Sequence, residues 1–166
     1  MRRLIMTILA SAVMCFAAEA QSNLKKIYDE SIDPMTQIDN AISKADRDGK
    51  FVICQVGGNW CRWCLMFADF ISKDSEITEL IDKNFEYIHV NYNPRERNDE
   101  SKMKKAEAML ARLGNPGRFG YPVFVVLDGD GKVIHIQDSS LLEEGNGYNK
   151  SKVMRFFSNW TPEAVK

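Results

Sequence analysis

The sequence lacks the features that define several large classes of protein. Neither charge is in excess, because 22 Lys and Arg residues stand against 23 Asp and Glu residues among 166. A net charge of −1 provides no basic field for a phosphate backbone, which argues against general nucleic-acid binding. Ten glycines and five prolines are too few for a low-complexity chain. Four cysteines are too few for a disulfide-dense miniprotein and too unevenly spaced for a four-cysteine zinc site.

The N-terminus predicts a secretory signal peptide over residues 1–20. Two arginines precede an apolar run, and Ala18-Glu19-Ala20 has the small-x-small pattern of a cleavage site. The run is short for a bilayer span. Met14 stands before Cys15, where a lipid-attachment signal has a small residue, so a cleaved peptide is favoured over a retained anchor or a lipoprotein.

Cleavage after residue 20 would leave Cys54, Cys61 and Cys64 in the mature chain. We expect that chain to be periplasmic or secreted, where disulfides persist, and to have no stable membrane insertion. The 45% hydrophobic content of the full sequence is sufficient for one domain with a buried core. We assign residues 21–33 to an N-terminal segment and residues 34–166 to that domain.

The spacing of apolar residues predicts the order of elements. Helical spacing covers 34–48, 60–72, 99–113 and 152–160, with a short amphipathic turn over 74–81. Strands are predicted over 51–56, 85–91, 121–127 and 132–137. The Asp-Gly-Asp-Gly stretch at 128–131 predicts a hairpin turn and not a calcium loop, because a lysine takes the next ligand position. This order is typical of an α/β fold with a central mixed β-sheet flanked by helices on both faces.

A cysteine pair lies where the first predicted strand leads into a helix. The motif is Cys61-Arg62-Trp63-Cys64, preceded by Gly57-Gly58-Asn59-Trp60. A cysteine at a helix N-terminus is favoured as a thiolate by unpaired backbone N–H groups and the helix dipole. Cys61 could then attack a disulfide, and Cys64 could resolve the mixed disulfide. Two other interpretations stay open at this point, a permanent structural disulfide and half of a metal site.

The chain resembles the thioredoxin superfamily in three places: the Trp60 to Cys64 motif after a strand and a glycine break, Asn93-Pro94, and Gly120-Tyr121-Pro122. It looks most similar to secreted bacterial thioredoxin-like proteins and to the C-terminal domain of the transmembrane thiol:disulfide interchange protein. The resemblance spans about residues 34–160. It implies a thioredoxin fold and disulfide exchange with protein substrates and a redox partner protein, without a cofactor or a metal. It also implies that Pro122 is a cis-proline facing the cysteine pair and that the Tyr121 backbone pairs with an extended substrate.

The sequence departs from the thioredoxin pattern beside the active cysteines. Gln55 occupies the position of a buried acid that moves the proton of the resolving thiol, and Tyr87 occupies that of a companion lysine. An amide is no general base, so proton transfer from Cys64 requires water or another group. Arg62 favours the thiolate and a more oxidising couple. Trp63 adds a bulky rim suited to a protein substrate.

The remaining candidates have weaker signals. Trp60 is as well explained by core packing as by substrate contact. Cys54, on the central strand, is interpreted as a buried, unreactive thiol, and a third redox role would require its side chain to point toward the pair. His89 and His135 are assigned structural or solvent-facing roles. The leading hypothesis is an exported thiol:disulfide oxidoreductase with catalytic Cys61 and Cys64 and with Trp60, Arg62, Trp63, Tyr121 and Pro122 binding substrate. Its rivals are a non-catalytic binding or adaptor domain with a permanent disulfide, and a copper or zinc carrier.

Overall fold

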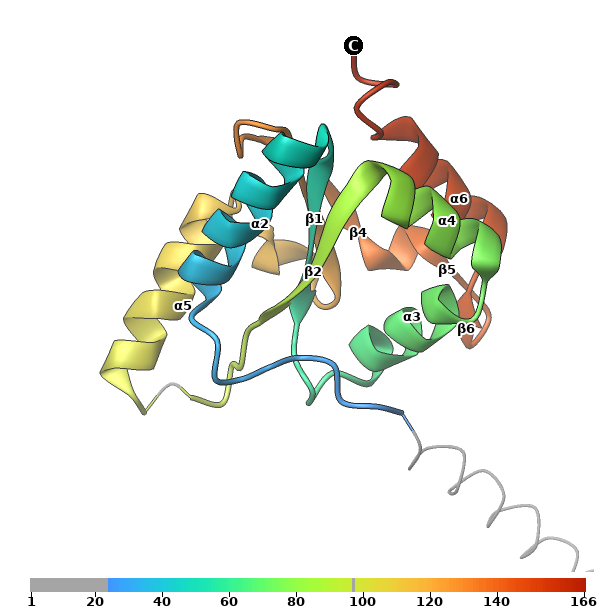
Figure 1. Ribbon diagram of the computed structural model, residues 1–166. Helices are drawn as coiled ribbons and strands as arrows, with labels where there is room; N and C mark the ends of the chain where they lie inside the picture. The colour runs from blue at the N-terminus through green and yellow to red at the C-terminus, as the bar shows by residue number, and fades with distance from the viewer. Residues whose placement is uncertain (1–23, 97) are drawn as a thin grey trace, which may run out of the picture.

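A computed structural model describes residues 24–96 and 98–166. The predicted signal peptide at 1–20 lies outside the described residues. The chain described forms a layered α/β structure with a β-sheet in the middle (Figure 1). This is the predicted fold class.

The main sheet contains strands β1 (Phe51–Gly57), β2 (Phe85–Asn91), β3 (Val123–Leu127) and β4 (Val133–Asp138) in the order β2-β1-β3-β4. β1 pairs with β2 in parallel and with β3 in antiparallel orientation, and β4 is antiparallel to β3. The sheet is therefore mixed, as predicted. β1 lies in its interior and is buried on both faces, which explains the nearly continuous apolar run in its sequence.

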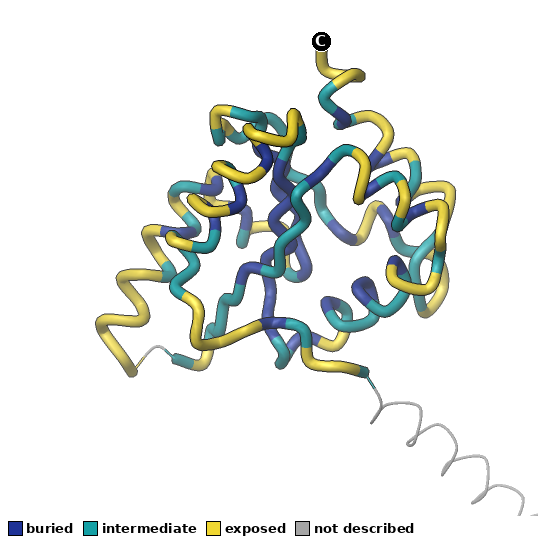
Figure 2. The backbone as a smooth tube through the Cα atoms, in the orientation of Figure 1, coloured by how far each residue is buried: buried dark blue, intermediate teal, exposed yellow. Residues whose placement is uncertain are grey.

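Helices cover both faces of the sheet. α2 (Pro34–Asp48) and α5 (Glu100–Arg112) lie on one face, and α3 (Arg62–Ser72), α4 (Ser75–Asn84) and α6 (Lys150–Asn159) lie on the other (Figure 1). Each face has its own apolar core, and the buried residues gather along the sheet between the helices (Figure 2). Two short 3-10 helices, η1 (Pro116–Phe119) and η2 (Ser139–Leu142), complete the helical segments described.

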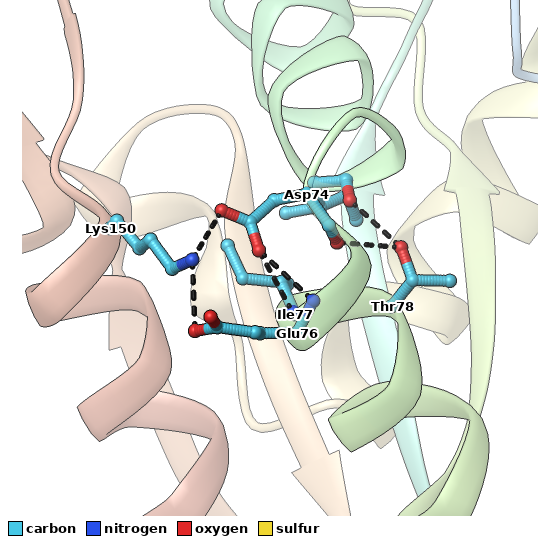
Figure 3. A network of polar contacts seen from close by, with 6 residues as sticks. Asp74, Glu76, Ile77, Thr78 and Lys150 are labelled. Carbon is cyan, nitrogen blue, oxygen red and sulfur yellow. Dashed lines mark hydrogen bonds and ion pairs between the residues drawn. The ribbon is translucent and has the colours of Figure 1, made fainter.

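Local sequence signals explain where the helices begin. Asp33 caps α2 through Thr36 N, with Pro34 in the first turn, where the missing N–H costs nothing. Asp74 caps α4 through Glu76 N and Ile77 N. The same carboxylate forms an ion pair with Lys150 at 2.8 Å, and Lys150 also pairs with Glu76 at 2.9 Å (Figure 3). This network joins the start of α4 to the start of α6.

The structure corrects two helix boundaries and adds one small hairpin. The short turn predicted at 74–81 is a helix that continues to Asn84, whose side chain donates to the Leu80 carbonyl in its last turn. The last helix begins at Lys150 because Asn149 caps it through Lys152 N. A small hairpin of β5 (Glu143–Glu144) and β6 (Gly147–Tyr148) was not predicted, because two-residue strands carry no periodic signal. The predicted turn at 128–131 is present, and the Asp128 carboxylate accepts hydrogen bonds from the Asp130 and Lys132 amides.

Candidate active site

The two cysteines of the motif lie at the junction of β1 and α3. Cys61 is the N-cap of α3 and its sulfur accepts a hydrogen bond of 3.2 Å from Cys64 N. The pair forms a disulfide, with Cα atoms 5.2 Å apart. Cys61 is 6% exposed and Cys64 is fully buried. A helix N-terminus supports a thiolate at position 61 in the reduced protein, because the Cys64 N–H donates to the sulfur and the helix dipole favours negative charge there.

Aromatic side chains from separate segments surround the pair. Trp60 is fixed by a hydrogen bond of 2.7 Å from its indole N–H to the Tyr92 carbonyl, and it packs edge-on against Tyr121. Tyr121 also stacks on Tyr92 with ring centroids 5.0 Å apart. On the other side, Trp63 meets Tyr148 edge-on, and the Tyr148 hydroxyl donates to the Trp63 carbonyl at 3.1 Å. Both tryptophans are only partly buried, so each keeps a surface toward solvent.

The structure brings the predicted substrate-binding residues to one end of the sheet. The Tyr121–Pro122 peptide bond is cis, and Tyr121 packs against the buried cluster of Tyr28, Cys61 and Cys64. Val123 pairs with Val56, so the register of β1 and β3 places Pro122 beside Gly57. Gly57 in turn lies against Cys64, because a Cβ at position 57 would overlap with the Cys64 sulfur. Arg62 is exposed in the first turn of α3.

Behind the pair, the two residues that depart from the thioredoxin pattern contact each other. The Tyr87 hydroxyl donates to Gln55 Oε1 at 2.6 Å. Gln55 Nε2 donates to the Cys64 carbonyl at 3.0 Å and to the Tyr28 hydroxyl at 2.8 Å. Gln55 is fully buried, and burial raises the pKa values of Tyr28 and Tyr87 above their ordinary range. A neutral hydrogen-bonded network therefore occupies the place of the expected buried charges.

Two residues of this site, Tyr28 and Asn59, were not predicted. Tyr28 comes from the segment before α2, which runs past the ends of β1 and β2 (Figure 1). Asn59 fastens that segment: its side-chain oxygen accepts from the amides of Ile27 and Tyr28, both at 3.1 Å, and its nitrogen donates to the Tyr28 carbonyl at 2.8 Å. No local pattern indicates the partner of Tyr28, which is about thirty positions away in the chain.

Cys54 is separate from the pair. It is fully buried in the core beneath α2 and α5, whereas Cys61 and Cys64 belong to a different cluster with Tyr28. Burial raises the pKa of Cys54 to about 12, although Arg112 opposes the shift. Because Cys54 belongs to a different core cluster, its side chain does not point toward the pair. Its burial and raised pKa agree with the interpretation as an unreactive thiol.

The two histidines lie apart from each other on β2 and β4. His89 packs edge-on between Tyr28 and Tyr87, and its buried Nε2 has no hydrogen-bond partner among the described residues. Burial lowers the pKa of His89 to about 4, so the ring is neutral at pH 7. His135 stacks on Trp160 with ring centroids 4.2 Å apart.

Across residues 24–96 and 98–166, no three His, Cys, Asp or Glu side chains gather in a group that could hold a metal ion.

The mixed sheet, the cysteine pair capping a helix and the cis-proline beside it define a thioredoxin-like α/β protein. Residues 15–156 match the family model Thioredox_DsbH, described as a protein of unknown function, DUF255, and the chain belongs to this family. Comparison with curated proteins gives no match. In the part of the chain that the structure describes, no helix has both the length and the apolar character needed to cross a membrane.

Solved structures agree with this assignment. The chain is similar to the crystal structure of a disulphide isomerase from Xylella fastidiosa Temecula1, at 28% identity and a TM-score of 0.66, over 82% of this chain and 97% of that one. It is also similar in fold to an oxidoreductase named DsbH, at 20% identity and a TM-score of 0.52, over 81% of this chain and 84% of that one. The family and the similarity to the disulphide isomerase support thiol:disulfide redox chemistry in general terms.

Proposed function

We propose that the protein is an exported thiol:disulfide oxidoreductase that exchanges disulfides with protein substrates, with Cys61 as nucleophile and Cys64 as resolving thiol. The observation that carries the proposal is the asymmetry of the pair. Cys61 caps the helix N-terminus and keeps 6% of its surface exposed, whereas Cys64 is fully buried. A thiolate-stabilised sulfur that is more accessible than its fully buried partner is the arrangement that disulfide exchange requires.

The reaction needs no cofactor. The Cys61 thiolate attacks one sulfur of a substrate disulfide, that bond breaks, and the released substrate thiolate takes a proton from water. Cys64 then loses its proton and attacks the Cys61 sulfur, which expels the second substrate thiolate and leaves the Cys61–Cys64 disulfide. Two electrons pass from the pair to the substrate, and the reverse sequence oxidises a substrate dithiol.

Substrate recognition is assigned to the rim around Cys61. Trp60, Trp63 and Tyr121 offer partly exposed aromatic surface, and the exposed Arg62 adds a positive charge beside the sulfur. Tyr121 and the cis-proline at 122 directly precede β3 and lie outside the residue pairs that join β3 to β1 and β4, so their backbone is the segment assigned to pair with an extended substrate. These features favour an unfolded or protein substrate over a small thiol.

Trapping the intermediate tests the assignment of the two cysteines. The probe is a synthetic peptide with one internal disulfide, incubated with reduced protein and analysed by mass spectrometry. Cys64→Ser should accumulate the peptide on Cys61, while wild-type protein releases reduced peptide and becomes oxidised. The matched variant Cys61→Ser keeps the buried thiol and should form at least about tenfold less adduct. If no adduct forms on Cys61 and wild-type protein does not reduce the peptide, a permanent disulfide in a binding domain is the better account.

Export is supported by the charged start, apolar run and cleavage pattern of residues 1–20. On this proposal the protein acts in the periplasm or outside the cell. Expression of the full chain in a bacterial host should yield a mature protein that begins at Gln21, as read by mass spectrometry of the intact protein. A chain that keeps residues 1–20 would contradict the proposal of a cleaved signal.

A further inference from the structure

The proposed function requires the buried thiol of Cys64 to ionise before it attacks Cys61. A thiolate in a buried site is costly unless a donor stabilises it. The residue at the expected acid position, Gln55, carries no titrating proton. The structure shows which neighbouring side chain can donate a hydrogen bond to the Cys64 thiolate.

The hydrogen bonds of Gln55 identify that side chain. The Cys64 carbonyl can only accept, so the side-chain nitrogen of Gln55 must face it, and its oxygen faces the Tyr87 hydroxyl. The second N–H of Gln55 points at the Tyr28 oxygen, which therefore acts as an acceptor there. The O–H proton of Tyr28 is consequently not used by this network, although the residue is only 4% exposed.

The Tyr28 hydroxyl and the Cys64 sulfur both lie close to Gly57. Gly57 has no side chain, and a Cβ added there would overlap with the Cys64 sulfur and lie 2.8 Å from the Tyr28 hydroxyl oxygen. The hydroxyl and the sulfur thus border the same small space. Tyr28 and the two cysteines also form one buried cluster.

We propose that Tyr28 is a positioning residue for the resolving step, whose hydroxyl donates a hydrogen bond to the Cys64 thiolate. In that step the Cys64 S–H bond loses its proton to water, the Cys64 sulfur bonds to the Cys61 sulfur, and the bond from Cys61 to the substrate sulfur breaks. The substrate leaves as a thiolate and is protonated by water. Tyr28 keeps its own proton throughout, because burial raises its pKa far above neutral.

The segment that carries Tyr28 is held in place by Asn59, which makes three hydrogen bonds to residues 27 and 28. Other ionisable side chains lie on the segments around the pair. They are Glu30 beside Asn59, Arg62 in α3, Tyr87 and His89 in β2, Tyr121 before β3, and Tyr148 in β6.

The inference rests on the proposed function, and one kinetic experiment separates the two. Reduced protein is mixed with an aromatic disulfide whose released thiolate absorbs visible light, and release is followed by stopped flow from pH 5 to 10. A first phase, proportional to reagent concentration, reports attack by Cys61. A second phase, independent of reagent concentration, reports attack by Cys64 on the mixed disulfide.

Tyr28→Phe should leave the first phase within about twofold of wild type. At neutral pH it should slow the second phase about tenfold and move the midpoint of its pH profile up by about one unit, the effect of one lost hydrogen bond to a charged group. Asn59→Ala keeps the hydroxyl but releases its segment, so it should shift the same midpoint in the same direction. Tyr148→Phe is the matched control, because its hydroxyl contacts the Trp63 carbonyl, and it should not move the midpoint.

An unchanged second phase in Tyr28→Phe would overturn the inference, and so would equal shifts in Tyr28→Phe and Tyr148→Phe. Loss of folding in Tyr28→Phe would leave Asn59→Ala to decide, and an unmoved midpoint in that variant would overturn the inference. Absence of both phases in wild-type protein would instead refute the proposed function.

Discussion

The side-chain amide of Gln55 donates a hydrogen bond of 3.0 Å to the backbone carbonyl of Cys64. A fully buried polar side chain on the central strand thereby supports the first turn of the helix that carries the cysteine pair. Because Gln55 also contacts Tyr28 and Tyr87, one neutral group links the N-terminal segment, β1, β2 and α3. The backbone around the resolving cysteine therefore depends on residues far from it in the sequence.

Removing the Gln55 amide should destabilise the protein. Gln55→Met keeps the volume but leaves the Tyr87 hydroxyl without its acceptor in a buried site, at a cost of about 2–4 kcal/mol in the free energy of unfolding. Urea denaturation of the oxidised protein at pH 7 measures this cost. Gln137→Met makes the same change on β4, where the side chain is half-buried, and should cost less than about 1 kcal/mol. Equal losses of unfolding free energy in the two variants would show that the hydrogen bonds of Gln55 contribute no more to stability than those of a half-buried glutamine.

A side chain at position 57 should disturb the cysteine pair. Gly57→Ala places a Cβ against the Cys64 sulfur and the Tyr28 hydroxyl, so the unfolding free energy should fall by about 1–3 kcal/mol. The matched control is Gly129→Ala in the β3–β4 turn, where an added Cβ meets no atom within 4 Å. Denaturation of both variants tests the prediction, which fails if their unfolding free energies are the same.

His89 should make the protein sensitive to mild acid. Its folded pKa of about 4 lies below the usual value near 6.5, so the unfolded chain binds a proton first as the pH falls. Stability from the neutral ring is complete above about pH 6.5 and declines toward pH 4, by about 3 kcal/mol in all. The capping carboxylates Asp33 and Asp74 have lowered pKa values, so their contributions are lost only at still lower pH.

His89→Phe should flatten the dependence of unfolding free energy on pH between 6.5 and 4, because it keeps aromatic packing against Tyr28 and Tyr87 and removes the titrating ring. Chemical denaturation at a series of pH values provides the measurement. His135→Phe retains His89 and should therefore retain its slope. A slope that persists in His89→Phe would assign the acid sensitivity to other groups.

Arg62 should make the couple more oxidising. Its charge is exposed in the first turn of α3, where it favours the Cys61 thiolate and hence the reduced form. An exposed interaction of this kind is weak, so Arg62→Gln should lower the reduction potential by only about 5–20 mV. Arg155→Gln, an equivalent change on exposed α6, should leave the potential unchanged. A rise in potential in Arg62→Gln would contradict this role.

Local sequence signals predicted most of the framework of the site. The apolar run of β1 and the glycine break after it placed the cysteine pair at a strand-to-helix junction, and the resemblance to thioredoxins predicted the cis bond before Pro122. Gln55 and Tyr87, singled out as departures from that pattern, contact each other in the structure. Periodicity and fixed spacing sufficed in these cases because the residues belong to regular elements or to one short motif.

The features of the site that were not predicted depend on contacts between segments far apart in the sequence. Tyr28 lies in a stretch without regular structure and is held at the site by Asn59, which binds its backbone from about thirty residues away, and by Gln55, which binds its hydroxyl. Neither Tyr28 nor Asn59 belongs to a pattern that predicts the other. The β5–β6 hairpin is likewise stabilised through Tyr148, which packs on Trp63 and Phe67 of α3 and has no signal in its own sequence.

The reduction potential of the Cys61–Cys64 pair tests the central claim most directly. The protein is equilibrated in thiol buffers of defined potential, free thiols are alkylated, and the fractions of reduced and oxidised protein are measured by mass spectrometry. Cys54 is buried away from the pair and does not enter the couple. A working oxidoreductase predicts a midpoint above about −300 mV, within reach of cellular redox partners. A midpoint far below that value would identify a permanent structural disulfide and contradict the account.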